Sequence, residues 1–310
     1  MAYLRAFGCY LPERVVDNAE VAGLTGGDPA WILQATGIEQ RRFASLEETV
    51  TSLGVRAAQE CLTSAGATAA DVGLILVSSG SAERRFPGPA AAVGLSLGMA
   101  GVPAIDLPLA SAGSLFGIAL AARLAPAYGN VLVVASEILS RVVRMDAASR
   151  DTAILFGDGA GACLVSESLG FAQVADAVLH SDGEFGDALS LGFDSPLRMD
   201  GRTIILQAAR KMPRAIAEVL ERNGRSVSEI AGFVLHQANL NLITRVAQAV
   251  GAPEEKFFRN LRRYGNTSSA SLLIAAAEHR RDGGFMGPTV LAAFGAGLNW
   301  GAVLTVPRMD

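Results

Sequence analysis

The feature that most restricts the fold is a repeat within the chain. Three pairs of segments share their pattern of apolar, small and acidic residues, and the members of each pair lie 158 or 159 residues apart. The pairs are 71–80 with 229–238, 110–123 with 268–281, and 130–139 with 289–298. Because the three pairs keep the same order and nearly the same spacing, the sequence indicates two copies of one structural unit.

Each copy alternates strand-like and helix-like segments. The strand-like segments are rich in Val, Ile and Leu without polar alternation, which is typical of sheets covered on both faces. Helical patterns lie between them, and those at 49–66 and 202–224 each end in a glycine, the residue that commonly closes a helix. We predict an α/β protein made of two duplicated halves, 1–168 and 169–310.

Composition and charge exclude several classes of protein. With 310 residues, 50% of them hydrophobic, the chain can bury a large core. A formal net charge of −4 provides no general attraction for nucleic acid. Cys9, Cys61 and Cys163 form no CxxC pair, so we expect neither a zinc site nor a disulfide framework, and we place the protein in the reducing cytoplasm. The nearly uncharged stretch 86–122 contains glycines and prolines that argue against a membrane span.

Polar residues with chemical potential fall at equivalent points of the two copies. His236 follows the strand-like run 230–235, at the carboxyl end where loops of α/β folds commonly carry function, and Ser78 holds that place in the first copy. Ser111 stands at the start of an apolar helix, and Asn266 lies just before the corresponding helix of the second copy. We therefore predict that Ser111, His236 and Asn266 meet in one site.

Plainer interpretations of these residues stay open from the sequence alone. Ser111 could serve only as the N-cap of its helix, and His236 could be a structural histidine. The segment FGDGAGA (156–162) resembles a nucleotide-binding loop only weakly, because a strand-like run follows it and not a helix. We expect its glycines to form a tight turn between strands; they are Gly157, Gly159 and Gly161.

Four motifs together resemble a known family. FGDGAGA, LHQANL, YGNTSSAS and AFGAGLNWGA occur in the order and spacing of β-ketoacyl-acyl-carrier-protein synthase III, of the thiolase superfamily, and the resemblance covers essentially the whole chain. The resemblance implies a thiolase-like five-layered αβαβα fold of two similar halves, assembled as a homodimer. It also implies an acyltransferase without a cofactor, whose substrates are thioesters of coenzyme A or of phosphopantetheine on an acyl-carrier protein.

The resemblance further implies a two-stage reaction of fatty-acid or polyketide biosynthesis. An acyl group moves from its thioester to the nucleophile. Malonyl-carrier protein then loses carbon dioxide, and the resulting carbanion attacks the acyl group. The family's cysteine, histidine and asparagine fall on Ser111, His236 and Asn266. The backbone N–H groups of Ser111 and Ala296 would form the oxyanion hole.

A serine at the position of the nucleophile departs from the family. A helix N-terminus can lower the pKa of a thiol well below about 8.5, whereas a hydroxyl needs a neighbouring base, for which His236 is the candidate. Three explanations are open. Ser111 is native and carries the acyl group, or it replaces a cysteine so as to trap a ligand, or the chain is a non-acylating partner subunit of a ketosynthase complex. The retained Asn266 favours condensation over transfer to a hydroxyl or an amine.

The substrate-binding positions of the family are matched only in part. Four residues fall on such positions: Trp31, Phe86, Arg150 and Phe294. Two arginines that contact coenzyme A in the family are replaced here by Ala35 and Asn241. Since a hydrogen bond to a charged group contributes roughly 1.5–3 kcal/mol, these replacements favour either a donor bound to a carrier protein or an unusual donor.

Two surfaces are candidates for contacts with other proteins. Phe86 matches a residue that reaches across the dimer to line the partner's acyl pocket. Arg210, Lys211 and Arg214 could form a face that docks an acidic carrier protein, and they could equally be a solvated helix face.

Overall fold

The computed structural model describes residues 1–192 and 194–308, and its ten main strands fall into two sets with one arrangement. The first set has the order β5 (Ala104–Leu107), β4 (Leu74–Ser78), β6 (Asn130–Glu137), β7 (Gly159–Ser166), β1 (Tyr3–Tyr10). The second has the order β12 (Phe257–Phe258), β11 (Gly232–Leu235), β13 (Thr289–Gly295), β14 (Asn299–Pro307), β8 (Ala172–Ser181). In each set the first three strands run parallel and the last two join antiparallel. The predicted duplication is therefore present in the strand order.

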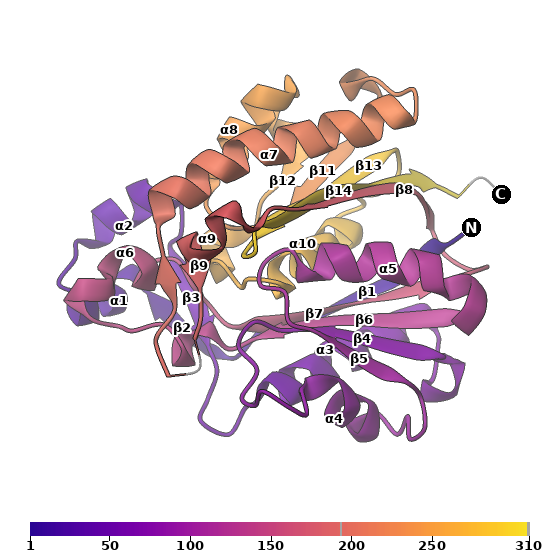
Figure 1. Ribbon diagram of the computed structural model, residues 1–310, viewed down its shortest axis with the longest axis horizontal. Helices are drawn as coiled ribbons and strands as arrows, with labels where there is room; N and C mark the ends of the chain where they lie inside the picture. Colours follow the sequence, from indigo (N-terminus) through magenta and orange to yellow (C-terminus); the bar gives the residue numbers. More distant parts are fainter. Residues whose placement is uncertain (193, 309–310) are drawn as a thin grey trace.

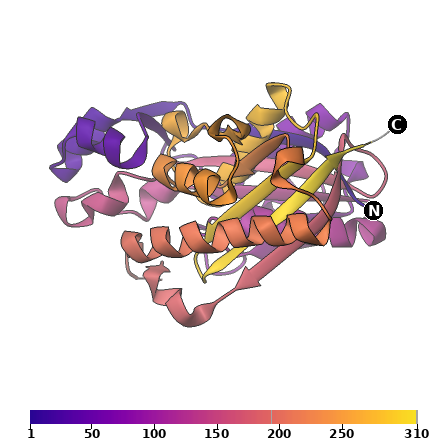
Figure 2. The same ribbon diagram turned by 90° about the horizontal axis from the view of Figure 1, so that it is seen from above.

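The two sets of strands stack as separate layers with helices between and outside them (Figure 1). They are linked where β1 pairs with β8 through Tyr3 with Gln173 and Leu4 with Ala172. The layer between them holds α5 (Gly113–Tyr128) and α10 (Ala270–Arg281). The outer layers hold α3 (Val50–Ala65) with α4 (Pro89–Ser96), and α7 (Gly201–Arg222) with α8 (Leu240–Val250). Figure 2 shows α7 lying along the outer face of the second set. The predicted five-layered αβαβα fold is confirmed.

Residue type explains why these elements form where they do. β4, β11 and β13 are buried along their whole length, as expected for strands covered on both faces. Gly66 closes α3 at φ 59°, and Gly224 follows α7 at φ 60°, conformations that only glycine adopts without strain. Both predicted helix ends are thus confirmed within two residues.

Smaller elements gather at one end of the layers, beside α7 and α8 (Figure 1). They are α1 (Asn18–Thr25), α2 (Pro29–Thr36), α6 (Arg150–Ala153), α9 (Leu261–Tyr264), β2 (Arg14–Asp17), β3 (Gln40–Phe43), β9 (Leu189–Ser190) and β10 (Arg198–Met199). The proposed boundary between halves at 168/169 falls in the connection from β7 to β8. Within the described ranges, we find no helix with the length and apolar character needed to cross a bilayer.

The predicted glycine turn is wrong. Gly159 and Gly161 lie inside β7, and they are small because α10 packs directly onto that strand. A Cβ atom on Gly161 would lie 2.5 Å from the Cβ of Leu273, and one on Gly157 would lie 2.4 Å from the carbonyl oxygen of Tyr264. Close approach of α10 to β7, and of the end of α9 to the loop before β7, explains this glycine pattern.

The register of the repeat also differs by one residue at the central helices. α5 begins at Gly113 and α10 at Ala270, an offset of 157 residues where the sequence indicated 158. The structural counterpart of Ser111 is therefore Ser268 and not Ser269. The backbone supports this assignment, since Ser111 and Ser268 both have a positive φ, at 62° and 47°.

Candidate active site

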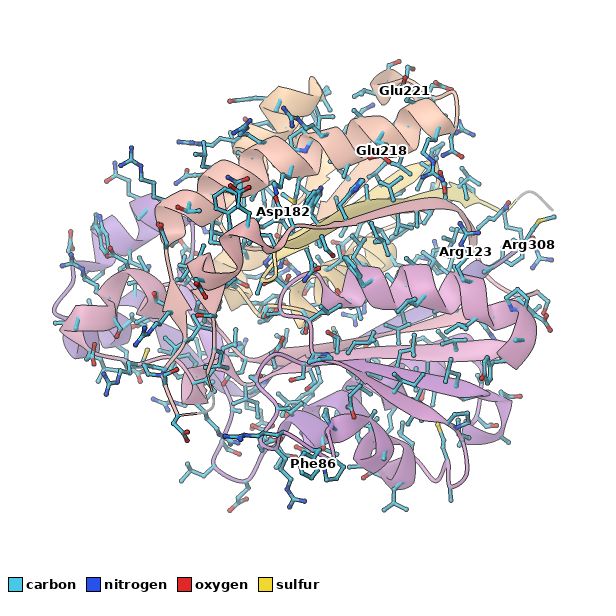
Figure 3. All side chains as sticks on the ribbon, in the orientation of Figure 1. Phe86, Arg123, Asp182, Glu218, Glu221 and Arg308 are labelled. Carbon is cyan, nitrogen blue, oxygen red and sulfur yellow. The ribbon has the colours of Figure 1, made fainter. Side chains whose placement is uncertain are left out.

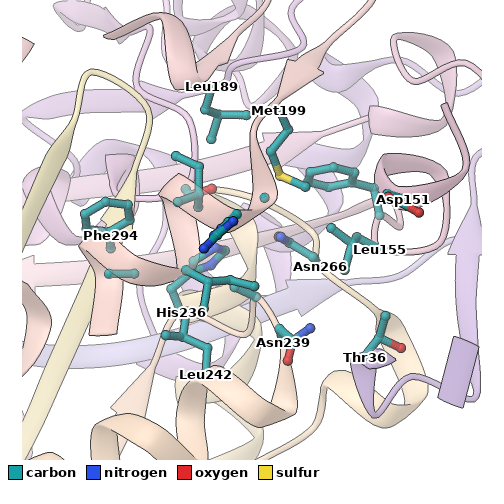
Figure 4. A pocket seen from close by; sticks show the side chains of 18 of the residues that line it. Thr36, Asp151, Leu155, Leu189, Met199, His236, Asn239, Leu242, Asn266 and Phe294 are labelled. Atoms are coloured by element: carbon teal, nitrogen blue, oxygen red, sulfur yellow. The ribbon is translucent and has the colours of Figure 1, made fainter. Parts of the chain in front are cut away.

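The three residues predicted to meet do line one cavity. This cavity, of about 550 Å³, opens beside the amino-terminal ends of α5, α7 and α8 and includes Ser111, His236 and Asn266 in its wall. Figure 4 shows His236 and Asn266 next to each other in this wall, with Phe294 on the far side of His236. All four residues are almost fully buried in the protein.

Ser111 is held in a strained conformation directly before α5. Its left-handed φ of 62° costs a non-glycine residue about 1–2 kcal/mol, which the surrounding contacts must offset. The N-cap of α5 is Ala112, without a side-chain capping bond, so the interpretation of Ser111 as a mere N-cap is wrong. The Ser111 hydroxyl makes no hydrogen bond to any residue that the structure describes, so it is available to a ligand in the cavity.

The backbone of Ser111 is tied to the second half of the molecule. Its N–H donates to Oγ of Ser268, its structural counterpart, at 2.9 Å. Ala296 lines a second cavity, of about 40 Å³, together with Ser111 and Ser268. A Cβ on Gly295 would lie 2.1 Å from the carbonyl oxygen of Ala110, which shows how closely the end of β13 approaches this loop. One of the two proposed oxyanion-hole N–H groups is thus engaged by a hydroxyl.

His236 follows β11 and is neutral. Its backbone N–H donates to the carbonyl of Ala292 at 2.9 Å, which fixes the residue against β13. The side chain is 4% exposed, and burial lowers the pKa of His236 to about 4. Desolvation disfavours the imidazolium form, so the imidazole is uncharged at neutral pH. Its Nδ1 lies 2.5 Å from Oγ of Ser271 in the first turn of α10.

Asn266 is fixed through both its backbone and its side chain. Its N–H donates to the carbonyl of Leu155 at 2.9 Å, and its own carbonyl accepts from the N–H of Gly157 at 3.0 Å. Its side-chain Oδ1 accepts the backbone N–H of Ser268 at 2.9 Å. Because Oδ1 is engaged, the amide NH₂ is the group that Asn266 can offer to a ligand.

A buried acidic side chain, that of Glu137, supports the backbone around this site. Glu137, at the end of β6, is fully buried and accepts hydrogen bonds from Gly80 N–H and the Ser81 hydroxyl of the first half. It also accepts from the hydroxyl and the backbone N–H of Ser269, the N-cap of α10, at 2.6 and 3.3 Å. Glu137 therefore fixes the residue that follows Ser268.

The mouth of the cavity holds some of the predicted substrate-binding residues. Trp31 lines it, and the Arg150 guanidinium lies 5.0 Å from the centre of the Trp31 ring. Asn241 donates a hydrogen bond from its side chain to the carbonyl of Ala35 at 3.1 Å, so the two replaced arginine positions touch each other without charge.

Two predicted contact residues lie elsewhere. Phe86 is 85% exposed, is not among the residues that line the cavity, and lies near α4 (Figure 3). Lys211 points into the protein: its Nζ pairs with Asp182 at 2.5 Å and lies 4.2 Å from the ring centre of Trp300. The predicted basic face is thus wrong for Lys211, whereas Arg210 and Arg214 are exposed.

The sequence reasoning missed three residues of the site: Glu137, Ser268 and Ser271. The signal that could have revealed the two serines is their spacing, since residues three apart at a helix start share a face. Glu137 carries no such signal, because its partners come from both halves. Within the described part of the chain, no group of three or more His, Cys, Asp or Glu side chains could hold a metal ion.

The fold and this cavity define the class of protein: an acyl-transferring enzyme of the thiolase type. Residues 105–183 match the family description "3-Oxoacyl-[acyl-carrier-protein (ACP)] synthase III", and residues 220–306 match that of its C-terminal region. The β-ketoacyl-[acyl-carrier-protein] synthase III of Oleidesulfovibrio alaskensis is 38% identical over 328 residues, covering 98% of both chains. The chain belongs to the 3-oxoacyl-acyl-carrier-protein synthase III family, as the motifs indicated.

Solved structures agree with this assignment. The crystal structure of 3-oxoacyl-[acyl-carrier-protein] synthase III from Aquifex aeolicus has a TM-score of 0.95 at 34% identity and covers 99% of this chain and 100% of its own. The priming β-ketosynthase of the R1128 polyketide pathway has a TM-score of 0.92 at 31% identity, covering 100% and 97%. Enzymes of this family condense acyl thioesters, so the expected substrate chemistry follows from membership.

Proposed function

We propose that this chain loads an acyl group from acyl-coenzyme A or acyl-carrier protein onto Ser111 and transfers it to malonyl-carrier protein. The observation that carries the proposal is the convergence of Ser111, His236 and Asn266 on one cavity at the start of α5. The name of one related structure, the priming β-ketosynthase of the R1128 polyketide biosynthetic pathway, supports the pathway class.

In the loading step, Oγ of Ser111 attacks the thioester carbonyl. The hydroxyl proton passes to the His236 imidazole and on to the departing thiol, and an oxygen ester forms as the carbon–sulfur bond breaks. Developing charge on the carbonyl oxygen is stabilised by the backbone N–H groups of Ser111 and Ala296, the former after release from Ser268.

In the condensing step, the malonyl unit loses carbon dioxide. Its thioester oxygen becomes an enolate, which His236 and Asn266 stabilise by hydrogen bonds. The enolate carbon then attacks the acyl ester, a carbon–carbon bond forms, and Ser111 leaves as an alkoxide that takes a proton from water. The two steps together consume this one proton and release carbon dioxide and the free thiol.

The size of the smaller cavity supports a short acyl group. At about 40 Å³, it is far below the roughly 150 Å³ of an apolar cavity that holds benzene. Its apolar wall comes from several leucines and one phenylalanine: Leu139, Phe156, Leu189, Leu191 and Leu197. We expect an acyl chain of roughly two to three carbons.

The proposal includes the assembly and the donor. We place the protein in the cytoplasm as a homodimer. The exposed Phe86 supports the dimer, because its side chain would meet a second copy. The uncharged contact between Ala35 and Asn241 supports donors on a carrier protein over free coenzyme A, because it offers no cation to the nucleotide phosphates.

Mass spectrometry of the intact protein and its peptides tests the loading step. After incubation with acetyl and hexanoyl donors, each on coenzyme A and on carrier protein, we expect an acetyl gain on the peptide containing Ser111. Ser111→Ala should abolish this gain. Ser114→Ala, which removes a buried hydroxyl in the first turn of α5, should retain the acetyl gain. If no donor adds mass to that peptide, the loading proposal is wrong.

One observation favours a second candidate, the non-acylating subunit. The Ser111 hydroxyl has no hydrogen bond to a base among the described residues. A subunit of this kind would associate stably with an active ketosynthase, and pathway activity would survive His236→Ala. Loss of that activity in the variant excludes this candidate.

A further inference from the structure

The tautomer of His236 depends on the hydrogen bond that its ring makes. The neutral imidazole carries one ring proton, on either Nδ1 or Nε2. Among the described residues, its ring makes a hydrogen bond only to Ser271, from Nδ1 to Oγ at 2.5 Å. A carboxylate, which would accept a proton from Nδ1, is absent from this contact. The protonation of the ring therefore depends on the direction of the bond to Ser271.

The surroundings of Ser271 decide that direction. Its Oγ accepts the backbone N–H of Gln237 at 3.1 Å, and the residue is 2% exposed. The described residues offer the Ser271 hydroxyl proton no acceptor other than Nδ1 of His236. If Nδ1 carried the proton, this hydroxyl proton would be buried without a partner, which is unfavourable. When the hydroxyl donates to Nδ1, every group in the contact is satisfied.

We propose that Ser271 is a positioning residue that holds His236 with its ring proton on Nε2, the nitrogen left to the cavity. The amide NH₂ of Asn266 faces the same cavity, because its Oδ1 is engaged by Ser268. Two uncharged donors then point at one ligand oxygen. This pair fits the thioester carbonyl of a malonyl unit, whose oxygen gains charge as carbon dioxide leaves.

This inference rests on the proposed function. It predicts that the two steps of the reaction need different protonation states of the His236 ring and are not equally favoured. The condensing step needs a proton on Nε2, and the loading step needs a lone pair there. Ser271 favours the first state, so acyl loading onto Ser111 is the disfavoured half of the reaction. To load, the ring proton must lie on Nδ1, and the Ser271 hydroxyl must turn so that its oxygen accepts a hydrogen bond from Nδ1–H.

The ring state can be measured without any substrate. The chain has only three histidines, so protein labelled with ¹⁵N at histidine gives three ring signals, and His236→Ala identifies the relevant one. Long-range proton–nitrogen spectra at neutral pH should show Nε2 protonated and Nδ1 unprotonated in the unaltered protein. A proton on Nδ1 overturns the proposal. Because no acylation is needed, failure of the loading proposal leaves this measurement unaffected.

Variants separate positioning from packing. Ser271→Ala should give a mixture of ring states and lower kcat for carbon dioxide release from malonyl-carrier protein about tenfold, with KM nearly unchanged. Ser271→Thr, which keeps the hydroxyl, should restore both. The matched control is Ser114→Ala, because Ser114 holds the equivalent position in α5 and its hydroxyl has no partner among the described residues. Equal losses in both alanine variants, or no rescue by threonine, contradict the proposal.

Discussion

The starts of α5 and α10 are copies of one another, yet they serve different ends. Ser111 and Ser268 both adopt a positive φ one residue before the N-cap, and Ser114 and Ser271 both lie in the first turn of the helix. In the first copy, the Ser111 hydroxyl faces the cavity and that of Ser114 has no partner among the described residues. In the second copy, both hydroxyls are bonded to the other parts of the site.

The strand ends before these helices differ in the same way. β4 ends at Ser78, whose hydroxyl donates to the carbonyl of Leu109 at 3.0 Å and so supports the loop before Ser111. β11 is followed by His236 at the equivalent place. The two copies therefore share one backbone conformation at the strand end and the helix start. The first copy carries the nucleophile position, and the second carries the groups that support it.

The largest effect on the rate is expected when His236 is replaced by serine, the residue at the equivalent position of the first copy. His236→Ser places the counterpart of Ser78 after β11 and removes both the candidate base and a donor to the enolate. Loss of a positioned acid–base group lowers rates by typically 10²–10⁴-fold, and we expect carbon dioxide release from malonyl-carrier protein to fall in that range. A variant that keeps more than half of the original rate would separate His236 from the chemistry.

The second prediction concerns the nucleophile position of the first copy. Ser111→Cys puts a thiol at the start of a 16-residue helix, where the helix N-terminus favours the thiolate. We expect acyl loading and overall condensation to rise about 10²-fold, measured by single-turnover acylation and by product formation. A neutral or harmful result would indicate that the site is adapted to serine as its native nucleophile.

The smallest effect concerns the bond between the copies. Ser268→Ala leaves the buried N–H of Ser111 without its acceptor, and this should lower the free energy of unfolding by about 1–3 kcal/mol. Urea unfolding measures the change. Ser111→Ala is the control, since it keeps the backbone bond and should unfold near the original midpoint; equal stability of both variants would show that the bond contributes nothing.

How far the sequence leads depends on the range of each interaction. Local patterns predicted both helix-ending glycines and the strand end before His236, because capping and hydrophobic burial act over a few residues. The repeat then brought Ser111, His236 and Asn266 together. The one-residue slip at α10 escaped prediction, because the runs of small residues before the two helices, ASAGS and TSSAS, align about equally well at either offset.

Long-range contacts set the remaining differences. Lys211 sits in a basic run, but Asp182 and Trp300, both far along the chain, draw it inward. Gly159 and Gly161 look like a turn until α10 packs against β7. The pairing of Ser271 with His236 likewise requires β11 and α10 to be side by side, which a linear pattern does not specify.

The burial of Glu137 has a consequence for how the molecule comes apart. Its side chain accepts hydrogen bonds from both copies, so the loss of either copy would leave a buried acidic side chain without part of its hydrogen bonds, at a cost in stability. The two halves are therefore interdependent, and we expect them to unfold in a single cooperative transition. The repeat remains visible in the strand order of the two halves, but neither half is expected to be stable without the other.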